Sequence, residues 1–247
     1  MKFRRMCAFF LALILLLPVS VPAEEAGMTV TDEEINGFFG GVLFIGDSIT
    51  RQLYTYIREI RNKDEDYMKG ARFSTAQSYS LFVGSRKFLT QNPAQLTVNG
   101  EATPLWKVVG HYKPEYAFIL LGVNDYIGEK IEKGVSYVER ITELCAESSP
   151  DTKLVFISLT PVTRRFCRKK DYRTLWDQYN AAMEKKCAEL GVYYMDLATP
   201  LKDEEGYLPE KYSSDNNYHL NSDGLDIWLR LLHDFARERI LEKRTEN

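Results

Sequence analysis

The sequence has 247 residues, of which 45% are hydrophobic and 27% are charged, and its formal net charge at pH 7 is −3. This composition is typical of a globular protein, and the length suits one large domain or two small ones. A mildly acidic chain without a strong basic cluster lacks the charge pattern of a nucleic-acid-binding protein, so we expect no nucleic-acid partner.

The first 23 residues have the pattern of a secretory signal peptide. Three of the first five residues are basic, an apolar run covers residues 7–21, and the small residue Ala23 precedes two acidic residues. We therefore expect cleavage after Ala23 and a mature domain of residues 24–247, secreted or in the cell envelope, with a formal net charge of −6. The apolar run is marginal for crossing a bilayer, which needs about 20 apolar residues. Stable membrane insertion is not expected after cleavage, and an uncleaved N-terminal anchor is the alternative.

The cysteines do not indicate a metal or disulfide framework. Cys145, Cys167 and Cys187 follow the signal segment, and an odd number leaves at least one thiol outside any internal pair. Cys145 and Cys187 fall in helical patterns, where they are interpreted as packed small hydrophobic residues. The sequence has no zinc-type spacing of Cys and His and no glycine-rich phosphate loop, so we expect neither a metal nor another cofactor.

Short apolar runs alternate with longer helical patterns along the mature chain. Runs rich in β-branched and aromatic residues predict strands at 42–45, 116–121, 154–159 and 192–195. Helical spacing predicts helices at 49–60, 135–146, 172–190 and from Ser222, as the N-cap, into the C-terminal tail. Continuous apolar strands are typical of a parallel sheet buried on both faces. The alternation of strands and helices predicts an α/β protein with helices on both sides of a central parallel sheet.

The stretch from 71 to 106 is less regular. Residues 73–76 have the composition of another central strand. Asn99-Gly100, between residues 95–98 and 101–103, predicts a tight hairpin that we place beside the main sheet.

Polar residues lie next to the ends of three of these elements, at the edge where a parallel sheet binds its ligands. They are Asp47 and Ser48 after the first strand, Asn124 and Asp125 after the second, and His219 before the last helix. A hydroxyl, an amide and an imidazole can form a nucleophile, an oxyanion donor and a general base. Each also has an ordinary structural interpretation: Ser48 as a helix cap, Asn124 as a turn residue and His219 as a packed histidine.

The combination resembles the SGNH (GDSL-type) hydrolases, which are esterases and acylhydrolases. Gly46-Asp47-Ser48 is similar to their first block, Gly122-Val123-Asn124-Asp125 to their Gly-x-Asn-Asp block, and Tyr218-His219-Leu220-Asn221 to their final block. These motifs span most of the mature chain. The resemblance implies a three-layer, flavodoxin-like fold and hydrolysis of a carboxylic ester by an activated serine, without a cofactor.

The same resemblance implies a role for each matching residue. Ser48 would be the nucleophile, and its backbone N–H would hold the oxyanion together with the Asn124 amide. His219 would be the base. Asp47, Gly122 and Asp125 are interpreted as supporting residues that hold neighbouring loops, and not as a glycosidase-like carboxylate pair.

The sequence departs from the family pattern at two places. The family has Asp three residues before the histidine, where this chain has Asn216; Asp215 stands one residue earlier. We expect Asp215 to orient His219, with Asn216 or a backbone carbonyl as the alternative. The family's glycine block is also absent, since the chain reads Gln77-Ser78-Tyr79-Ser80. A backbone N–H needs no glycine, so Ser78 is the candidate for a further oxyanion donor.

The resulting prediction is a secreted esterase that forms an acyl-Ser48 intermediate. Its substrate would be a small-molecule or glycan-linked acyl ester. Export would place the enzyme outside the cytoplasm, which suggests the O-acetyl groups of a glycan. Two alternatives remain at this stage: an O-acyltransferase that uses the same acyl-enzyme, and a catalytically silent binding domain of the cell envelope. Tyr79, Tyr126, Phe166 and Tyr218 are either an aromatic cleft or core residues. The basic stretch 164–170 is either an anion-attracting rim or a solvated loop.

Overall fold

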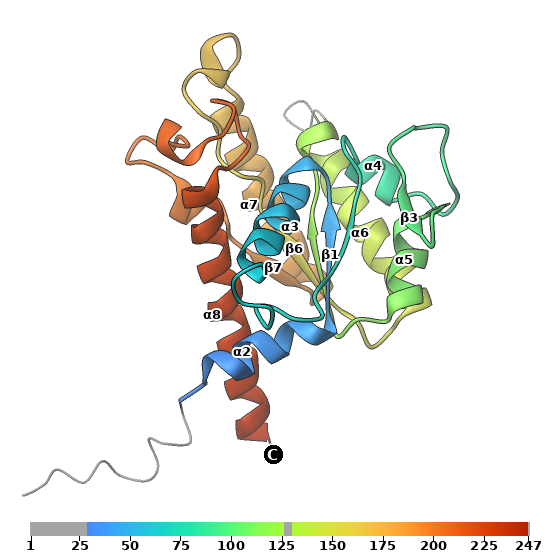
Figure 1. The fold of residues 1–247 in the computed structure, drawn as a ribbon. Coiled ribbons are helices and arrows are strands. Elements are labelled where there is room, and N and C mark those ends of the chain that lie inside the picture. The colour runs from blue at the N-terminus through green and yellow to red at the C-terminus, as the bar shows by residue number, and fades with distance from the viewer. Residues whose placement is uncertain (1–28, 126–129, 247) are drawn as a thin grey trace, which may run out of the picture.

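A computed structural model describes residues 29–125 and 130–246. At its centre is a sheet of five parallel strands in the order β2-β1-β5-β6-β7 (Figure 1). The strands are β1 (Val42–Gly46), β2 (Arg72–Thr75), β5 (Tyr116–Leu120), β6 (Lys153–Ile157) and β7 (Tyr193–Met195). Taken in chain order this is the 2-1-3-4-5 arrangement of flavodoxin-like folds. The predicted parallel α/β fold is therefore confirmed.

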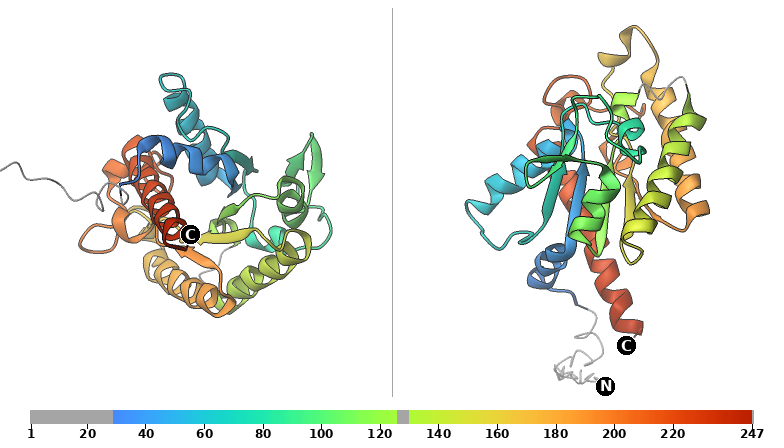
Figure 2. Two further views of the ribbon diagram at one scale, coloured as in Figure 1. Left: turned by 90° about the horizontal axis from the view of Figure 1, so that it is seen from below. Right: turned by 90° about the vertical axis from the view of Figure 1, so that its right-hand side faces the viewer.

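Helices cover both faces of the sheet, which gives three layers (Figure 2). One face packs against α2 (Asp32–Phe38), α3 (Ser48–Arg61) and α8 (Ser222–Glu246). The other packs against α5 (Leu105–Tyr112), α6 (Ile131–Ser148) and α7 (Tyr172–Leu190). The shorter elements are α4 (Leu81–Gly84), the hairpin β3 (Leu96–Val98) and β4 (Glu101–Thr103), and the 3₁₀ turns η1 (Phe39–Gly41), η2 (Val123–Asp125), η4 (Phe166–Arg168), η5 (Thr199–Leu201) and η6 (Glu210–Tyr212).

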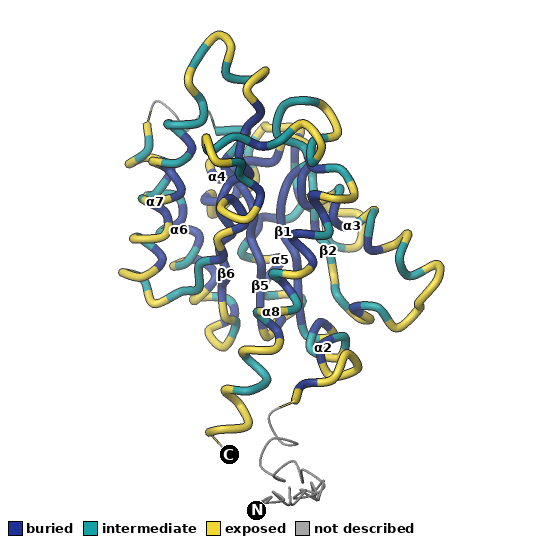
Figure 3. Tube along the Cα trace, turned by 90° about the vertical axis from the view of Figure 1, so that its left-hand side faces the viewer, coloured by how far each residue is buried: buried dark blue, intermediate teal, exposed yellow. Residues whose placement is uncertain are grey.

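The core consists of two layers separated by the sheet. Successive residues of β1 face opposite sides, so Phe44 joins the cluster under α3 and α8 while Ile45 joins the cluster under α6 and α7. Phe44 stacks between Phe73 of β2 and Phe118 of β5, with ring centroids 4.7 and 5.2 Å away. All five residues of β1 are buried, as the dark tube in Figure 3 shows. The burial explains why this strand is a continuous apolar run in the sequence.

The boundaries differ from the sequence prediction where caps and irregular stretches are involved. Asp47, not Ser48, caps α3, because its carboxylate accepts the Ile49 N–H at 3.0 Å. At α8, Asn221 precedes Ser222 and accepts the Gly224 N–H at 3.1 Å, so Asn221 takes the capping position predicted for Ser222. The predicted hairpin is confirmed as a separate two-stranded sheet.

In the stretch from 71 to 106, the strand indicated at 73–76 is present as β2 of the main sheet. The stretch also holds α4, which the sequence analysis did not predict, and it leads into α5. None of the helices in residues 29–125 and 130–246 has the length and apolar character needed to cross a membrane. The predicted signal segment, residues 1–23, lies outside the described residues.

Candidate active site

Ser48 lies at the sharp turn between β1 and α3. The turn requires glycine at position 46, because a Cβ there would clash with Thr50 Oγ1 at 2.0 Å and with the Leu120 carbonyl oxygen at 2.7 Å. Ser48 is the first residue of α3, and the N–H groups of a first helical turn have no acceptor within the helix. The turn therefore presents both the hydroxyl and the N–H of Ser48 at the carboxyl edge of the sheet.

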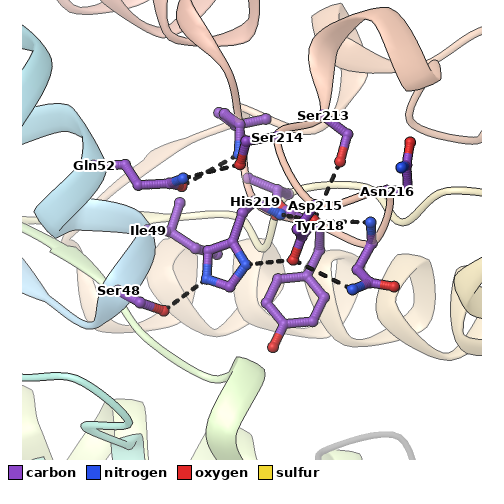
Figure 4. Close-up of polar contacts among 12 residues, drawn as sticks. Ser48, Ile49, Gln52, Ser213, Ser214, Asp215, Asn216, Tyr218 and His219 are labelled. Carbon is purple, nitrogen blue, oxygen red and sulfur yellow. Dashed lines mark hydrogen bonds and ion pairs between the residues drawn. The ribbon is translucent and has the colours of Figure 1, made fainter.

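Ser48, His219 and Asp215 form a continuous chain of hydrogen bonds (Figure 4). Ser48 Oγ lies 2.9 Å from His219 Nε2, and His219 Nδ1 lies 2.7 Å from Asp215 Oδ2. The serine and the carboxylate therefore hold opposite nitrogens of one imidazole ring. A carboxylate at Nδ1 keeps Nε2 free to accept the serine proton.

Asp215 also organises the loop that carries the histidine. Its Oδ1 accepts the Asn217 N–H at 2.8 Å and the His219 N–H at 3.3 Å. Partial burial by itself would raise the pKa of the Asp215 carboxyl, but hydrogen bonds from the His219 ring and the Asn217 N–H outweigh it. The net pKa lies below the ordinary aspartate value, so Asp215 is ionised at neutral pH.

The extra residue in this loop is accommodated by Asn216. Its φ of 56° places it in the left-handed region, which Asn adopts more readily than most residues. Its carbonyl accepts a 2.6 Å hydrogen bond from Thr163 Oγ1, and the carboxylate that meets His219 is that of Asp215. Of the two candidates from the sequence, the structure brings Asp215 to the ring.

The loop is held from two sides by residues that the sequence analysis did not single out. Thr160 Oγ1 donates to the Tyr218 carbonyl at 3.0 Å, and the Thr163 N–H donates to the Asn217 carbonyl at 2.8 Å. Both threonines are fully buried. On the other side Gln52 of α3 donates to Ser214 Oγ at 3.1 Å and accepts the Leu220 N–H at 3.2 Å. No sequence motif marks these residues, because each contacts a loop more than 50 residues away in the chain.

Asn124 lies beside the fully buried carboxylate of Asp47. Its Nδ2 donates to Asp47 Oδ2 at 2.8 Å and to the Tyr79 carbonyl at 3.1 Å, so both amide hydrogens have acceptors in this structure. Burial raises the pKa of Asp47 to about 7; the Ile49 N–H opposes this rise and the nearby Asp125 charge adds to it. The Asp47 carboxylate is thus held by the Ile49 N–H and the Asn124 amide, directly before Ser48 in the chain.

Asp125 and Ser78 shape the adjoining edge. Both oxygens of Asp125 accept backbone N–H groups, from Leu81 at 2.7 Å and Phe82 at 2.8 Å, which ties η2 to α4. Burial raises the pKa of the Asp125 carboxyl against these hydrogen bonds. Ser78 has a φ of 60° in a turn closed by the Tyr79 N–H on the Ala76 carbonyl, so it adopts a conformation usual for glycine. Gly122, with a φ of 136°, needs the freedom that only glycine has.

A protein-family model for the GDSL-like lipases and acylhydrolases matches residues 44–227, a span that includes Ser48, Asn124, Asp215 and His219. This chain belongs to the GDSL-like lipase/acylhydrolase family. No curated protein sequence matches this GDSL-family chain.

Solved structures agree with the family assignment at the level of the fold. A GDSL-like lipase from Bacteroides thetaiotaomicron is similar with a TM-score of 0.57 and 16% identity, over 90% of this chain and 95% of that one. A catalytic mutant of an acetylxylan esterase from Geobacillus stearothermophilus is similar with a TM-score of 0.55 and 14% identity, over 79% of this chain and 93% of that one. At these identities the likeness shows a shared GDSL-type fold.

The aromatic residues of this GDSL-family protein divide between core and rim. Tyr79 is fully buried and belongs to the core, and Tyr126 lies outside the described residues. The Tyr218 ring lies against the His219 ring at a centroid distance of 4.7 Å with the planes tilted by 32°, and Phe166 contacts Tyr218 edge-on at 5.3 Å. Within the basic stretch, Arg164 pairs with Asp203 at 2.9 Å and Glu205 at 2.5 Å. This part of the stretch is therefore charge-balanced.

The two other histidines of the GDSL-family chain, and Cys145 and Cys187, contact or pack against other parts of the fold. His233 is half-buried and within 3.2 Å of Tyr67 Oη, and His111 contacts Tyr112 edge-on at the end of α5. Cys145 and Cys187 are buried in α6 and α7, where burial raises both thiol pKa values to about 12. Across 29–125 and 130–246 no three His, Cys, Asp or Glu side chains gather in a way that could hold a metal ion.

Proposed function

We propose that this protein is an exported serine esterase in which Ser48 is the nucleophile, His219 the general base and Asp215 the residue that orients the histidine. The observation that carries the proposal is the chain of two hydrogen bonds, 2.9 and 2.7 Å long, through the two nitrogens of His219. A silent binding domain has no need for this order of hydroxyl, imidazole and ionised carboxylate. The arrangement therefore favours an enzyme.

In the first half-reaction His219 Nε2 takes the proton of Ser48 Oγ as the oxygen attacks the ester carbonyl. The tetrahedral intermediate collapses, the alcohol leaves with the proton from His219, and the acyl group remains on Ser48. Water then attacks the acyl-enzyme and gives up a proton to His219. The second tetrahedral intermediate collapses, the bond from Ser48 Oγ to the acyl carbon breaks, His219 returns the proton to Ser48 Oγ, and the carboxylic acid is released. Ionised Asp215 stabilises the imidazolium that forms in both steps.

The oxyanion would be held by three donors. The Ser48 N–H is the first, because it opens a helix and needs no intrahelical acceptor. The Asn124 amide is the second. We propose that its N–H, which now donates to the Tyr79 carbonyl, donates to the oxyanion instead, because this is the longer of the two Asn124 hydrogen bonds. The backbone at Ser78 is the third. Each such donor is worth about 10²–10³ in rate.

The proposed substrate is a small acyl ester, with an O-acetylated glycan as the first class to test. Support comes from the signal-like segment before residue 24, which would place the enzyme outside the cytoplasm, and from the acetylxylan esterase that shares the fold. Export is tested by cell fractionation and by the N-terminal residue of the mature protein, for which Glu24 is expected.

The nucleophile is tested by treating the purified protein with a fluorophosphonate and measuring intact mass. We expect a single adduct on the wild-type protein, none on Ser48→Ala, and full labelling of the control Ser136→Ala, whose exposed hydroxyl bonds to the Lys133 carbonyl within α6. A folded wild-type protein that takes up no adduct would overturn the proposal.

A further inference from the structure

A cavity of about 380 Å³ lies between α3 and the start of α8 and reaches Ser48. Its α3 wall is formed by Ser48, Arg51, Gln52, Thr55, Tyr56 and Glu59, and the remaining lining residues come from the segment 220–225. Spacings of three and four residues place these side chains along one face of the helix. A substrate bound to Ser48 can therefore extend along α3 into this cavity.

Most polar side chains in the cavity are already bonded within the protein. Gln52 bonds with Ser214 and Leu220 at 3.1 and 3.2 Å. The Tyr56 hydroxyl donates to Asp226 at 2.7 Å. Asn221 Nδ2 donates to the Lys211 carbonyl at 2.7 Å. These groups shape the cavity but have little capacity left for a ligand.

Arg51 is different. It stands three residues after Ser48, about one helical turn away on the same face, and is exposed. Within residues 29–125 and 130–246 its guanidinium has no hydrogen-bond or ion-pair partner. Glu59 is the acidic residue of the lining, but it is eight residues further on, or about 12 Å along the helix axis, so the two charges are too far apart to pair.

We propose that Arg51 binds a carboxylate carried by the ester substrate about one helical turn from the scissile carbonyl. The proposal rests on the proposed esterase function and names a substrate class for it: esters of alcohols that bear a carboxylate, such as acid-containing sugars. The guanidinium presents paired N–H donors that match the two oxygens of a carboxylate. Arg51 is the one cation among the described lining residues, and a single guanidinium balances the charge of a monoanion but not of a doubly charged phosphate.

The test compares two acetyl esters of nearly equal size that differ in this charge: 4-acetoxybenzoate and the neutral 4-acetoxybenzamide. Acetate release is followed by pH-stat titration, and kcat/KM is determined for both with the wild-type protein, Arg51→Gln and Arg58→Gln. Arg58 is the matched control, because it is on the same helix but lies over the Tyr54 ring at 5.6 Å and does not line the cavity. Intrinsic reactivity differences between the esters cancel when the anionic-to-neutral ratio is compared between variants.

We expect Arg51→Gln to lower the anionic-to-neutral ratio of kcat/KM by about tenfold, mainly by raising KM for the anionic ester. A hydrogen bond to a charged group contributes enough binding free energy for a change of about this size. Arg58→Gln should keep the wild-type ratio. Added salt should reduce the ratio in the wild-type protein, because the guanidinium is exposed to solvent. An equal ratio in wild type and Arg51→Gln would overturn the proposal.

A binding measurement separates this proposal from the proposed function. 4-Acetoxybenzoate is titrated calorimetrically into Ser48→Ala with and without Arg51→Gln. Weaker binding to the double variant supports the role of Arg51 even if the wild-type protein cleaves neither ester, an outcome that would count against the esterase alone. Equal binding to both proteins contradicts the proposal whatever the catalytic result.

Discussion

Gln52 Oε1 accepts a 3.2 Å hydrogen bond from the Leu220 N–H, which ties the helix that carries Ser48 to the residue that follows His219. The same side chain donates to Ser214 Oγ at 3.1 Å, on the other side of Asp215. Ser214 and Leu220 flank the segment that holds the carboxylate and the imidazole, and the Ser214 N–H donates to the His219 carbonyl at 3.0 Å. One glutamine therefore ties the helix that carries Ser48 to both ends of the segment that carries Asp215 and His219.

Replacing Gln52 with Met should lower kcat by about tenfold to a hundredfold, because small displacements of reacting groups have costs of that size. Met keeps the length of the side chain and removes both hydrogen bonds. KM should change less than kcat, since both ends of the Gln52 amide are bonded within the protein and Met keeps the cavity wall in place. Steady-state kinetics on 4-nitrophenyl acetate gives both constants, and Gln95→Met is the control, because Gln95 bonds only within the 90–95 loop. An unchanged kcat in a folded Gln52→Met protein would contradict a positioning role.

Asp215→Asn should lower kcat by about 10³–10⁴, the loss seen when the orienting carboxylate of a serine triad becomes an amide. Asn216→Ala should leave kcat within about threefold and reduce the free energy of unfolding by about 1 kcal/mol, since Ala is less suited to the left-handed φ of 56°. Kinetics and urea unfolding of the two variants separate orientation of the imidazole from support of the turn. If Asn216→Ala lost activity as severely as Asp215→Asn, the assignment of the third residue would be wrong.

Asp47→Asn should change how stability depends on pH. The folded-state pKa of Asp47 is raised to about 7 by burial, so the folded protein holds a proton that the unfolded chain has already released above pH 4. The wild-type free energy of unfolding should therefore fall between about pH 4 and pH 7 relative to the variant, which carries no titrating group there. At about 1.4 kcal/mol per pKa unit the difference reaches at most roughly 4 kcal/mol.

The measurement for Asp47→Asn is urea unfolding at pH 5, 6, 7 and 8, with the stability difference between variant and wild type increasing up to pH 7. Activity should fall at the same time, because an amide at position 47 offers a donor where the Asn124 amide needs an acceptor. A stability difference that is flat across this range would show that Asp47 is ionised normally.

Ser78 should tolerate glycine and reject valine. Its φ of 60° is open to glycine and is strained for β-branched residues. Ser78→Gly should keep kcat within about threefold, since the proposed oxyanion donor is a backbone group. Ser78→Val should lower the free energy of unfolding by about 1–3 kcal/mol and reduce kcat. Thermal unfolding and steady-state kinetics test the pair, and a large loss of kcat in Ser78→Gly would instead assign a role to the hydroxyl.

Much of the fold could be predicted from local patterns. The strands β1, β5 and β6 are buried on both faces, and burial on both faces requires apolar residues at successive positions. Their positions are therefore visible in the sequence as continuous apolar runs. The stretch that contains α4 and α5 was harder to predict, because these helices are short and gain most of their stability from packing against the sheet and α6. The caps of α3 and α8 each lie one residue before the predicted position. In each case two neighbouring residues, Asp47 and Ser48 or Asn221 and Ser222, are of types that cap helices well, so the sequence does not distinguish them.

The sequence by itself determined which chemical groups meet at the edge of the sheet: Ser48, Asn124 and His219 each follow or precede an element whose end lies there. Tertiary structure decided which acid meets the His219 ring, how Ser48 and His219 are held 2.9 Å apart, and where the cavity beside Ser48 runs. Those outcomes depend on the turn at Asn216 and on contacts of Gln52, Thr160 and Thr163 with a distant loop. Sequence spacing records the order of residues along one element, whereas these contacts join elements whose separation is set only when the whole sheet has packed.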